Sequence, residues 1–103
     1  MIKNIEPPSH LSDTMKNWWR RVNEDFAMEA HHLHLLQLAC EAFDQAETAR
    51  VALMIQGTTF HDRWQQPRQR PEVAIQQQAR RDFSRFVREL GLQNTEIPTS
   101  NRS

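Results

Sequence analysis

Residues 7–26 read PPSHLSDTMKNWWRRVNEDF, and this stretch predicts a capped amphipathic helix. Ser12 suits the N-cap position, and Asp13 follows in the first turn, where a negative charge interacts favourably with free backbone N–H groups. Leu11 occupies the position of a hydrophobic staple. On a helical wheel, the apolar side chains fall within about 100° of one face; they are Leu11, Met15, Trp18, Trp19, Val22 and Phe26. We therefore expect a helix with one buried face.

A second, longer helix is expected from Ala30 to Gln56, and it should stop at Gly57, because glycine readily adopts a left-handed conformation after a helix. About 27 residues form a rod of roughly 40 Å. One broad face is apolar: Leu35, Leu36, Leu38, Ala39, Ala42, Phe43, Ala46, Ala49 and Leu53. Residues 51–55 are apolar on every side, so the end of the rod should contact more than one neighbour.

We infer from these extensive apolar faces that copies of the chain associate. The residues assigned to the interface between copies are Trp18, Trp19, Val51, Met54 and Ile55. For the two adjacent tryptophans, packing in a core or an interface is favoured over stacking on nucleic-acid bases, because both belong to the apolar face of the first helix.

Residues 57–70 interrupt the helical period and favour either an extended loop or a short hairpin, since two threonines lie close to Phe60 and Trp64. Pro71 fits the first position of a third helix, which should run to Leu90 and be closed by Gly91. Its expected buried stripe consists of Ile75, Ala79, Phe83, Phe86, Val87 and Leu90. The expected fold is all-α, with three main helices and the long central helix forming an antiparallel hairpin.

The chain length of 103 residues allows one domain with a modest core. We expect an N-terminal extension over residues 1–10, a helical oligomerisation core over 11–91, and a flexible tail over 92–103. No apolar run approaches the ~20 residues of a membrane span, and the first residues lack a secretory signal, so we expect a cytoplasmic protein. Cys40, the one cysteine, has no partner for an internal disulfide.

The formal net charge is zero, but the charges are segregated along the chain. Residues 1–22 sum to +2, 23–56 to −5, 57–90 to +3, and 91–103 to zero. Opposite charges could join neighbouring subunits and leave basic surface for an anionic partner. Alternatively, the helices of one chain neutralise each other.

Catalytic motifs are absent from the sequence. It contains no Gly-x-Ser-x-Gly turn and no glycine-rich phosphate loop, and both glycines are assigned to helix ends. His31, His32 and His34, with Cys40 nearby, would point to different faces of a helix and so would not converge on a metal. We expect no enzymatic activity, no cofactor and no metal; a metal-dependent enzyme built on these histidines is the least favoured alternative.

Basic side chains are the better candidates for function, because lysine and arginine contact DNA phosphates without reading sequence. The candidate DNA-binding residues lie in three groups along the chain: Lys16, Arg20 and Arg21; Arg63, Arg68 and Arg70; and Arg81, Arg85 and Arg88. The sequence shows no convincing helix-turn-helix spacing.

Three segments together resemble phage terminase small subunits. They are Pro-Ser-His-Leu-Ser at 8–12 leading into Trp-Trp-Arg at 18–20, Leu-Gln-Leu-Ala-Cys-Glu-Ala-Phe at 36–43, and Arg-Glu-Leu-Gly-Leu at 88–92. Ser100 and Arg102 match a Ser/Thr-x-Arg element that often follows. The resemblance covers about residues 7–102.

The resemblance implies a non-catalytic packaging component that forms a homo-oligomer, commonly a ring, in the host cytoplasm. Its implied partners are double-stranded viral DNA and a separate large terminase subunit with ATPase and nuclease activities. The alternative from another class is a helical adaptor that binds only protein and regulates a nuclease or motor. Salt-dependent affinity for DNA distinguishes these two functions.

Overall fold

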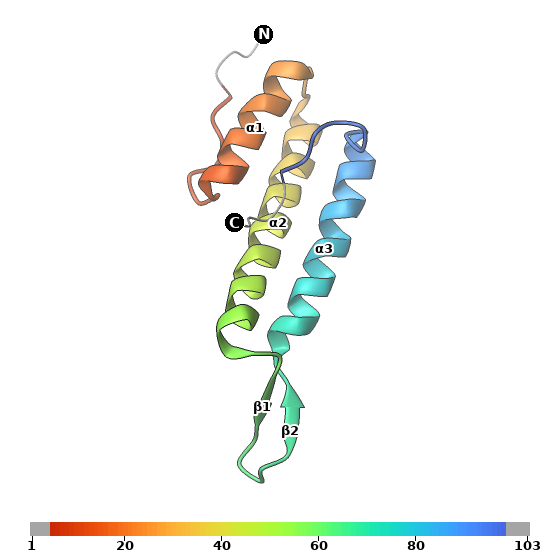
Figure 1. The fold of residues 1–103 in the computed structure, drawn as a ribbon. Helices are drawn as coiled ribbons and strands as arrows, with labels where there is room; N and C mark the ends of the chain where they lie inside the picture. Colours follow the sequence, from red (N-terminus) through yellow and green to blue (C-terminus); the bar gives the residue numbers. More distant parts are fainter. Residues whose placement is uncertain (1–4, 99–103) are drawn as a thin grey trace.

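The computed structural model describes residues 5–98. It contains three helices and a small two-stranded sheet: α1 (Asp13–Asp25), α2 (Ala30–Gln56), β1 (Thr59–His61), β2 (Pro67–Gln69) and α3 (Pro71–Leu90). Helices α2 and α3 form a long antiparallel hairpin, α1 packs beside the first half of α2, and the strands project from the opposite end (Figure 1). The molecule is elongated, with extents of 60 × 24 × 22 Å.

The expectation of an all-α fold is corrected by the two strands. They pair antiparallel, with Thr59 opposite Gln69, Phe60 opposite Arg68 and His61 opposite Pro67. Thr59 and Phe60 favour extended backbone, and Arg70 N donates to Thr58 O at 2.8 Å beside the last strand pair. The sequence of this segment is compatible with either an extended loop or a short hairpin, and the segment forms a β-hairpin.

Helix boundaries follow local capping chemistry. Ser12 accepts a hydrogen bond from Met15 N at its side chain, which confirms it as the N-cap of α1. Helices α2 and α3 have the expected bounds, and Gly91 adopts the left-handed conformation with φ 75° and ψ 25°. Gly57 differs from the expectation, because its φ of 81° is combined with a ψ of 176°, outside the left-handed helical region.

The core lies where α1 crosses the first half of α2 and the last turns of α3. Trp18 contacts Phe83 with ring centroids 5.7 Å apart, and Phe43 contacts the same ring at 5.6 Å. Fully or nearly buried around them are Leu11, Met15, Trp18, Trp19, Val22, Leu36, Ala39, Cys40, Val87 and Leu92. Aromatic rings of this size provide much of the apolar area that a small domain can bury.

Two residues expected in buried stripes are exposed. Phe26 lies beyond the last helical residue of α1, where the backbone is extended and the apolar stripe of the helix does not continue. Ile75 lies in the first turns of α3, far from the end of the α2–α3 helical hairpin that packs against α1.

The packed core extends beyond residues 11–91 at both ends. Ile5 packs against it, and its carbonyl accepts a hydrogen bond from Trp19 Nε1 at 3.0 Å. In the segment expected to be a flexible tail, Leu92 is completely buried and Ile97 packs on the core, because the chain folds back after Gly91. Ser100 and Arg102 lie outside the described residues. Over residues 5–98, no helix is long and apolar enough to span a bilayer.

Candidate functional site

The end of the molecule opposite α1, here called the distal end, displays most of the exposed large apolar side chains. It comprises the last turns of α2, the β-hairpin of residues 58–70 and the first turns of α3. Met54 is 67% and Ile55 74% exposed. Other exposed apolar residues of this end are Val51, Phe60, Trp64 and Ile75.

The exposed residues of α2 continue the stripe that binds α1. Leu36, Cys40 and Phe43 pack in the core. Val51 lies 11 residues after Cys40 and Met54 lies 11 residues after Phe43, which is about three helical turns, so both are on the same side of α2. Helix α1 has 13 residues against 27 in α2 and therefore covers only the first half of this stripe (Figure 1). The second half, with Val51 and Met54, has no covering helix within residues 5–98.

The turn of the β-hairpin is organised by Asp62. Its Oδ1 accepts hydrogen bonds from Trp64 N and Gln66 N, both at 2.9 Å, and its Oδ2 accepts one from Arg68 Nε at 3.0 Å. Two backbone hydrogen bonds close the turn: Asp62 N donates to Gln66 O at 3.0 Å, and Gln65 N donates to Asp62 O at 2.9 Å. The hydrogen bonds from Gln66, Arg68 and Trp64 hold the pKa of Asp62 below its ordinary value.

These bonds place Gln65 at a φ of 64°, a position more often occupied by glycine or asparagine. Sequence reasoning did not find this turn, although an aspartate that caps its own turn is a known local signal. The turn therefore has a defined geometry without a glycine.

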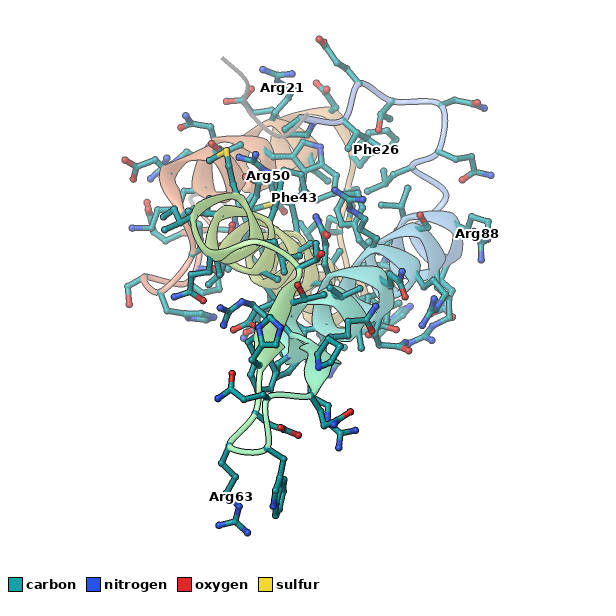
Figure 2. All side chains as sticks on the ribbon, turned by 60° about the horizontal axis from the view of Figure 1, so that its bottom comes forward. Arg21, Phe26, Phe43, Arg50, Arg63 and Arg88 are labelled. Atoms are coloured by element: carbon teal, nitrogen blue, oxygen red, sulfur yellow. The ribbon has the colours of Figure 1, made fainter. Side chains whose placement is uncertain are left out.

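The three arginines of the hairpin have different surroundings. The Arg63 guanidinium lies 4.3 Å from the Trp64 ring centroid, and the Arg70 guanidinium lies 5.6 Å from that of Phe60. Arg68 is paired with Asp62. Arg63 is at the far end of the hairpin and points away from the helices (Figure 2).

The arginines of the helices are largely engaged within the chain. Arg20 donates to Asn17 at 3.4 Å and Arg21 pairs with Glu96 at 3.6 Å. Arg81 donates to Gln78 at 3.0 Å, and Arg85 lies 3.5 Å from Asp82 and 3.8 Å from Glu89. Exposed Arg88 and half-buried Lys16 have no ion pair in the described part of the chain.

The nine candidate DNA-binding residues do not form one patch. Those of the β-hairpin lie at one end of a 60 Å molecule, whereas those of α1 lie at the other end together with those of α3, which are in the last turns of that helix. Arg21, Arg63 and Arg88 accordingly point in different directions (Figure 2).

The residues expected at an interface between copies differ in burial. Trp18 and Trp19 are 2% and 4% exposed, because α2 and α3 already cover them inside one chain. They belong to the core and not to the exposed surface. Val51, Met54 and Ile55 are exposed and remain candidates for an interface.

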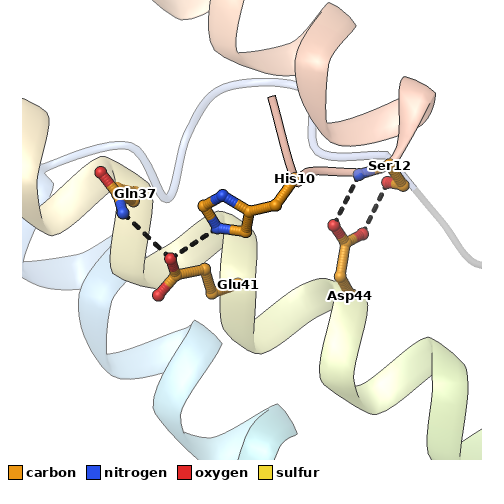
Figure 3. A network of polar contacts seen from close by, with 5 residues as sticks. All are labelled: His10, Ser12, Gln37, Glu41 and Asp44. Carbon is orange, nitrogen blue, oxygen red and sulfur yellow. Dashed lines mark hydrogen bonds and ion pairs between the residues drawn. The ribbon is translucent and has the colours of Figure 1, made fainter. Parts of the chain in front are cut away.

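A polar network that the sequence did not reveal attaches the start of α1 to α2 (Figure 3). Ser12 donates through its backbone N to Asp44 Oδ2 at 2.8 Å and through Oγ to Asp44 Oδ1 at 2.6 Å. Glu41 Oε2 lies 2.8 Å from His10 Nε2 and accepts from Gln37 at 3.0 Å. His10 and Glu41 are 31 residues apart in the chain and Ser12 and Asp44 are 32 apart, so no local pattern joins these pairs.

One of the histidines at the start of α2 caps the N-terminal end of this helix. His32 Nδ1 accepts a hydrogen bond from Glu29 N at 3.3 Å, and the rings of His31 and His32 lie 4.0 Å apart. Across residues 5–98, no group of three or more histidine, cysteine, aspartate or glutamate side chains is arranged to hold a metal ion. Cys40 lies apart from them in the core.

The geometry defines a small protein built on a helical hairpin, with an uncovered apolar end and a projecting basic β-hairpin. A family model described as phage terminase, small subunit, matches residues 15–97, which include all of these features. The chain belongs to the phage terminase small subunit family, and the resemblance inferred from the sequence is confirmed.

The family has a role in phage DNA packaging, and its members are generally non-catalytic. No curated protein and no solved structure matches this chain.

Proposed function

We propose that this protein is a non-catalytic small terminase subunit that assembles into a homo-oligomeric ring in the host cytoplasm. The ring recognises viral DNA and delivers it to the large ATPase and nuclease subunit, or regulates that subunit. Membership of the family is the observation that carries the proposal.

Assembly is supported by the uncovered half of the α2 stripe. A second copy that packs on Val51, Met54 and Ile55 would remove this apolar surface from water, at about 25 cal/mol for each Å² buried. Next to the stripe, a shallow hollow of about 310 Å³ lies between α2 and α3 and is lined in part by Ala49, Ala52 and Ile75. Contact between such different surfaces of successive copies is heterologous, and it closes into a ring when the rotation between copies permits.

Binding of DNA is supported by exposed arginines on the hairpin and on α3. A ring multiplies each of these positions by the number of copies, so that modest contacts with phosphate sum to useful affinity. Zero net charge per chain means that this attraction is local to the arginine-bearing surfaces.

The test measures binding of the 103-residue chain to a duplex from the phage's own packaging region, with an unrelated duplex of equal length as the control. Anisotropy titrations between about 50 and 200 mM salt should show affinity that falls steeply with salt, by about 0.9 log units per log unit of salt for each phosphate contact. Absence of binding to DNA and to the large subunit would overturn the proposal.

A protein-only adaptor is the second candidate. The observation in its favour is that Arg21, Arg68 and Arg85 each have a carboxylate neighbour in the same chain. It predicts that the chain co-purifies with the large subunit and does not shift DNA at low salt.

A further inference from the structure

Trp64 is the only tryptophan of the described chain that is displayed to solvent. It is 64% exposed, whereas Trp18 and Trp19 are almost completely buried. An indole ring is a large apolar group that is highly buried on average, and tryptophan and arginine are enriched among the residues that dominate binding energy at interfaces. The ring lies at the tip of the β-hairpin, beside the guanidinium of Arg63.

The tip is held in one geometry. The Asp62 carboxylate accepts hydrogen bonds from both Trp64 N and Gln66 N, so the backbone on either side of Gln65 is fixed. Fixing a contact loop before binding lowers the entropy that association costs. Arg63 and Trp64 are therefore presented by a preorganised turn.

The hairpin is also the most positively charged part of the distal end. Residues 58–70 contain three arginines and one aspartate, a net charge of +2. Arg68 is bound to that aspartate, but no carboxylate pairs with Arg63 within residues 5–98. On α3, by contrast, Arg85 has Asp82 and Glu89 beside it. Exposed Arg88 has no ion pair in the described part of the chain, but it is on a helix surface and not on a projecting turn.

The shape of the hairpin suits double-stranded DNA. A major groove about 12 Å wide admits a two-stranded β-ribbon, and an arginine at its tip can donate to guanine edges or to phosphates. Exposed Gln65, Gln66 and Gln69 add amides that hydrogen bond to base edges. An indole can pack against the thymine methyl groups that line the same groove.

Resting on the proposed function, we propose that the tip of the β-hairpin is the element that enters a groove of double-stranded DNA. Arg63 and Trp64 make the contacts, and Asp62 is a positioning residue. The arginines of α1 and α3 add weaker phosphate contacts and long-range attraction.

The first experiment compares Arg63→Ala and Trp64→Ala with the controls Arg20→Ala and Arg88→Ala, which remove one charge from α1 and α3. Affinity for the duplex is measured by anisotropy, and the solution mass and far-UV spectrum establish that each variant is folded and assembled. The tip variants should lose about tenfold or more in affinity, and the controls about threefold or less. Equal losses for tip and control variants would overturn the proposal.

A direct readout uses the fluorescence of the chain. Trp18 and Trp19 are buried, so acrylamide quenches mainly Trp64. Saturating duplex DNA should protect this accessible fraction from quenching, and Trp64→Ala should remove the effect. Unchanged quenching at saturation would show that DNA binds elsewhere and would overturn the proposal.

Asp62 is tested by a matched pair of substitutions. Asp62→Asn and Asp62→Ala both remove one negative charge, but only asparagine keeps an oxygen that can accept from Trp64 N and Gln66 N. If Asp62 positions the tip, Asp62→Asn binds DNA at least as tightly as the native chain and Asp62→Ala binds several-fold more weakly than Asp62→Asn. Equally tightened binding by both variants would contradict the positioning role.

The outcomes separate this inference from the proposed function. A native chain that binds no DNA, alone or with the large subunit, overturns both. Native binding that tip substitutions leave unchanged overturns the inference alone. Loss of large-subunit binding in Trp64→Ala, with DNA binding intact, assigns the tip to a protein partner and also overturns the inference.

Discussion

Asp44 and Glu41 fix where α1 sits on α2. Asp44 receives two hydrogen bonds from Ser12, the same residue that caps α1, so the helix begins and is attached to α2 at one point. Glu41 contacts His10, which lies two residues before Ser12 in the chain. These acidic residues of the central segment therefore act as hydrogen-bond acceptors inside the chain. Ser12 and Gln37 carry no charge, so these bonds hold α1 in place without cancelling the negative charge of the segment.

Cys40 illustrates how burial controls chemistry at one residue. Desolvation, reinforced by the negative charges of Asp44 and Glu41, raises the pKa of its thiol from 9.0 to about 12. At pH 8 only about one thiol in ten thousand would be ionised, and thiol reagents attack the thiolate. We expect Cys40 to react slowly with a disulfide reagent in native buffer and rapidly in denaturant; rapid native labelling would contradict the packing described.

Glu41 predicts a dependence of stability on pH. Its hydrogen bond with Gln37, followed by its contact with His10, holds its pKa below the ordinary value of 4.5. A carboxylate with a lowered folded pKa stabilises the fold above its unfolded pKa, and this contribution is lost as the pH falls through the folded pKa.

Glu41→Gln should therefore lower the free energy of unfolding at pH 7 by less than about 1 kcal/mol, since the pair is partly exposed. Below pH 4 the difference from the native chain should shrink. Urea unfolding at pH 7 and pH 3 measures both, with exposed Glu24→Gln as the control. A difference of the same size at both pH values would argue against the role of this carboxylate.

At the residue scale, the sequence identified the arginines that could contact DNA, but it could not predict which of them form ion pairs within the chain. The pair of Arg68 with Asp62 requires the folded turn, and the pair of Arg21 with Glu96 requires the returning C-terminal segment. The burial of Trp18 and Trp19 within one chain depends equally on tertiary packing. Wheel patterns identify an apolar face, but they do not say whether the same chain or another copy covers it.

At the element scale, the two glycines end α2 and α3 in different conformations. Gly91 is left-handed, whereas Gly57 combines a positive φ with an extended ψ, a region essentially restricted to glycine. A Cβ would meet nothing within 4 Å at either position, so backbone strain alone sets the cost of substitution.

Gly91→Ala should therefore lower the free energy of unfolding by about 1 kcal/mol, and Gly57→Ala by about 1–3 kcal/mol. Gly91→Asn should recover most of the loss, because asparagine tolerates the left-handed region, but Gly57→Asn should not. Chemical denaturation of the four variants measures these differences. Equal rescue by asparagine at both positions would contradict the two conformations.

The bounds of α2 and α3 could be predicted because each end carries a strong local signal: Gly57, Pro71 and Gly91. The hairpin could not be settled, since strands of three residues are too short for a period and its turn depends on the Asp62 side chain. The packing of Leu92 and Ile97 was also missed, because a polar tail with two apolar residues gives no periodic pattern.

At the scale of the whole molecule, the difference in length between α1 and α2 is the decisive feature. A short helix covers half of a long apolar stripe and leaves Val51, Met54 and Ile55 in water. A monomer that exposes such a surface would be unusual for a chain with so small a core. We expect another copy to cover it.

Sedimentation velocity on the 103-residue chain tests this claim most directly. Met54→Ser and Ile55→Ser are combined in one variant, and Trp64→Ala is the control, because it removes a similarly exposed apolar side chain from the β-hairpin and not from the α2 stripe. The account predicts one discrete oligomer for the native chain and for Trp64→Ala, and a folded monomer or much weaker association for the double variant. A native chain that sediments as a monomer at the highest attainable concentration would contradict it.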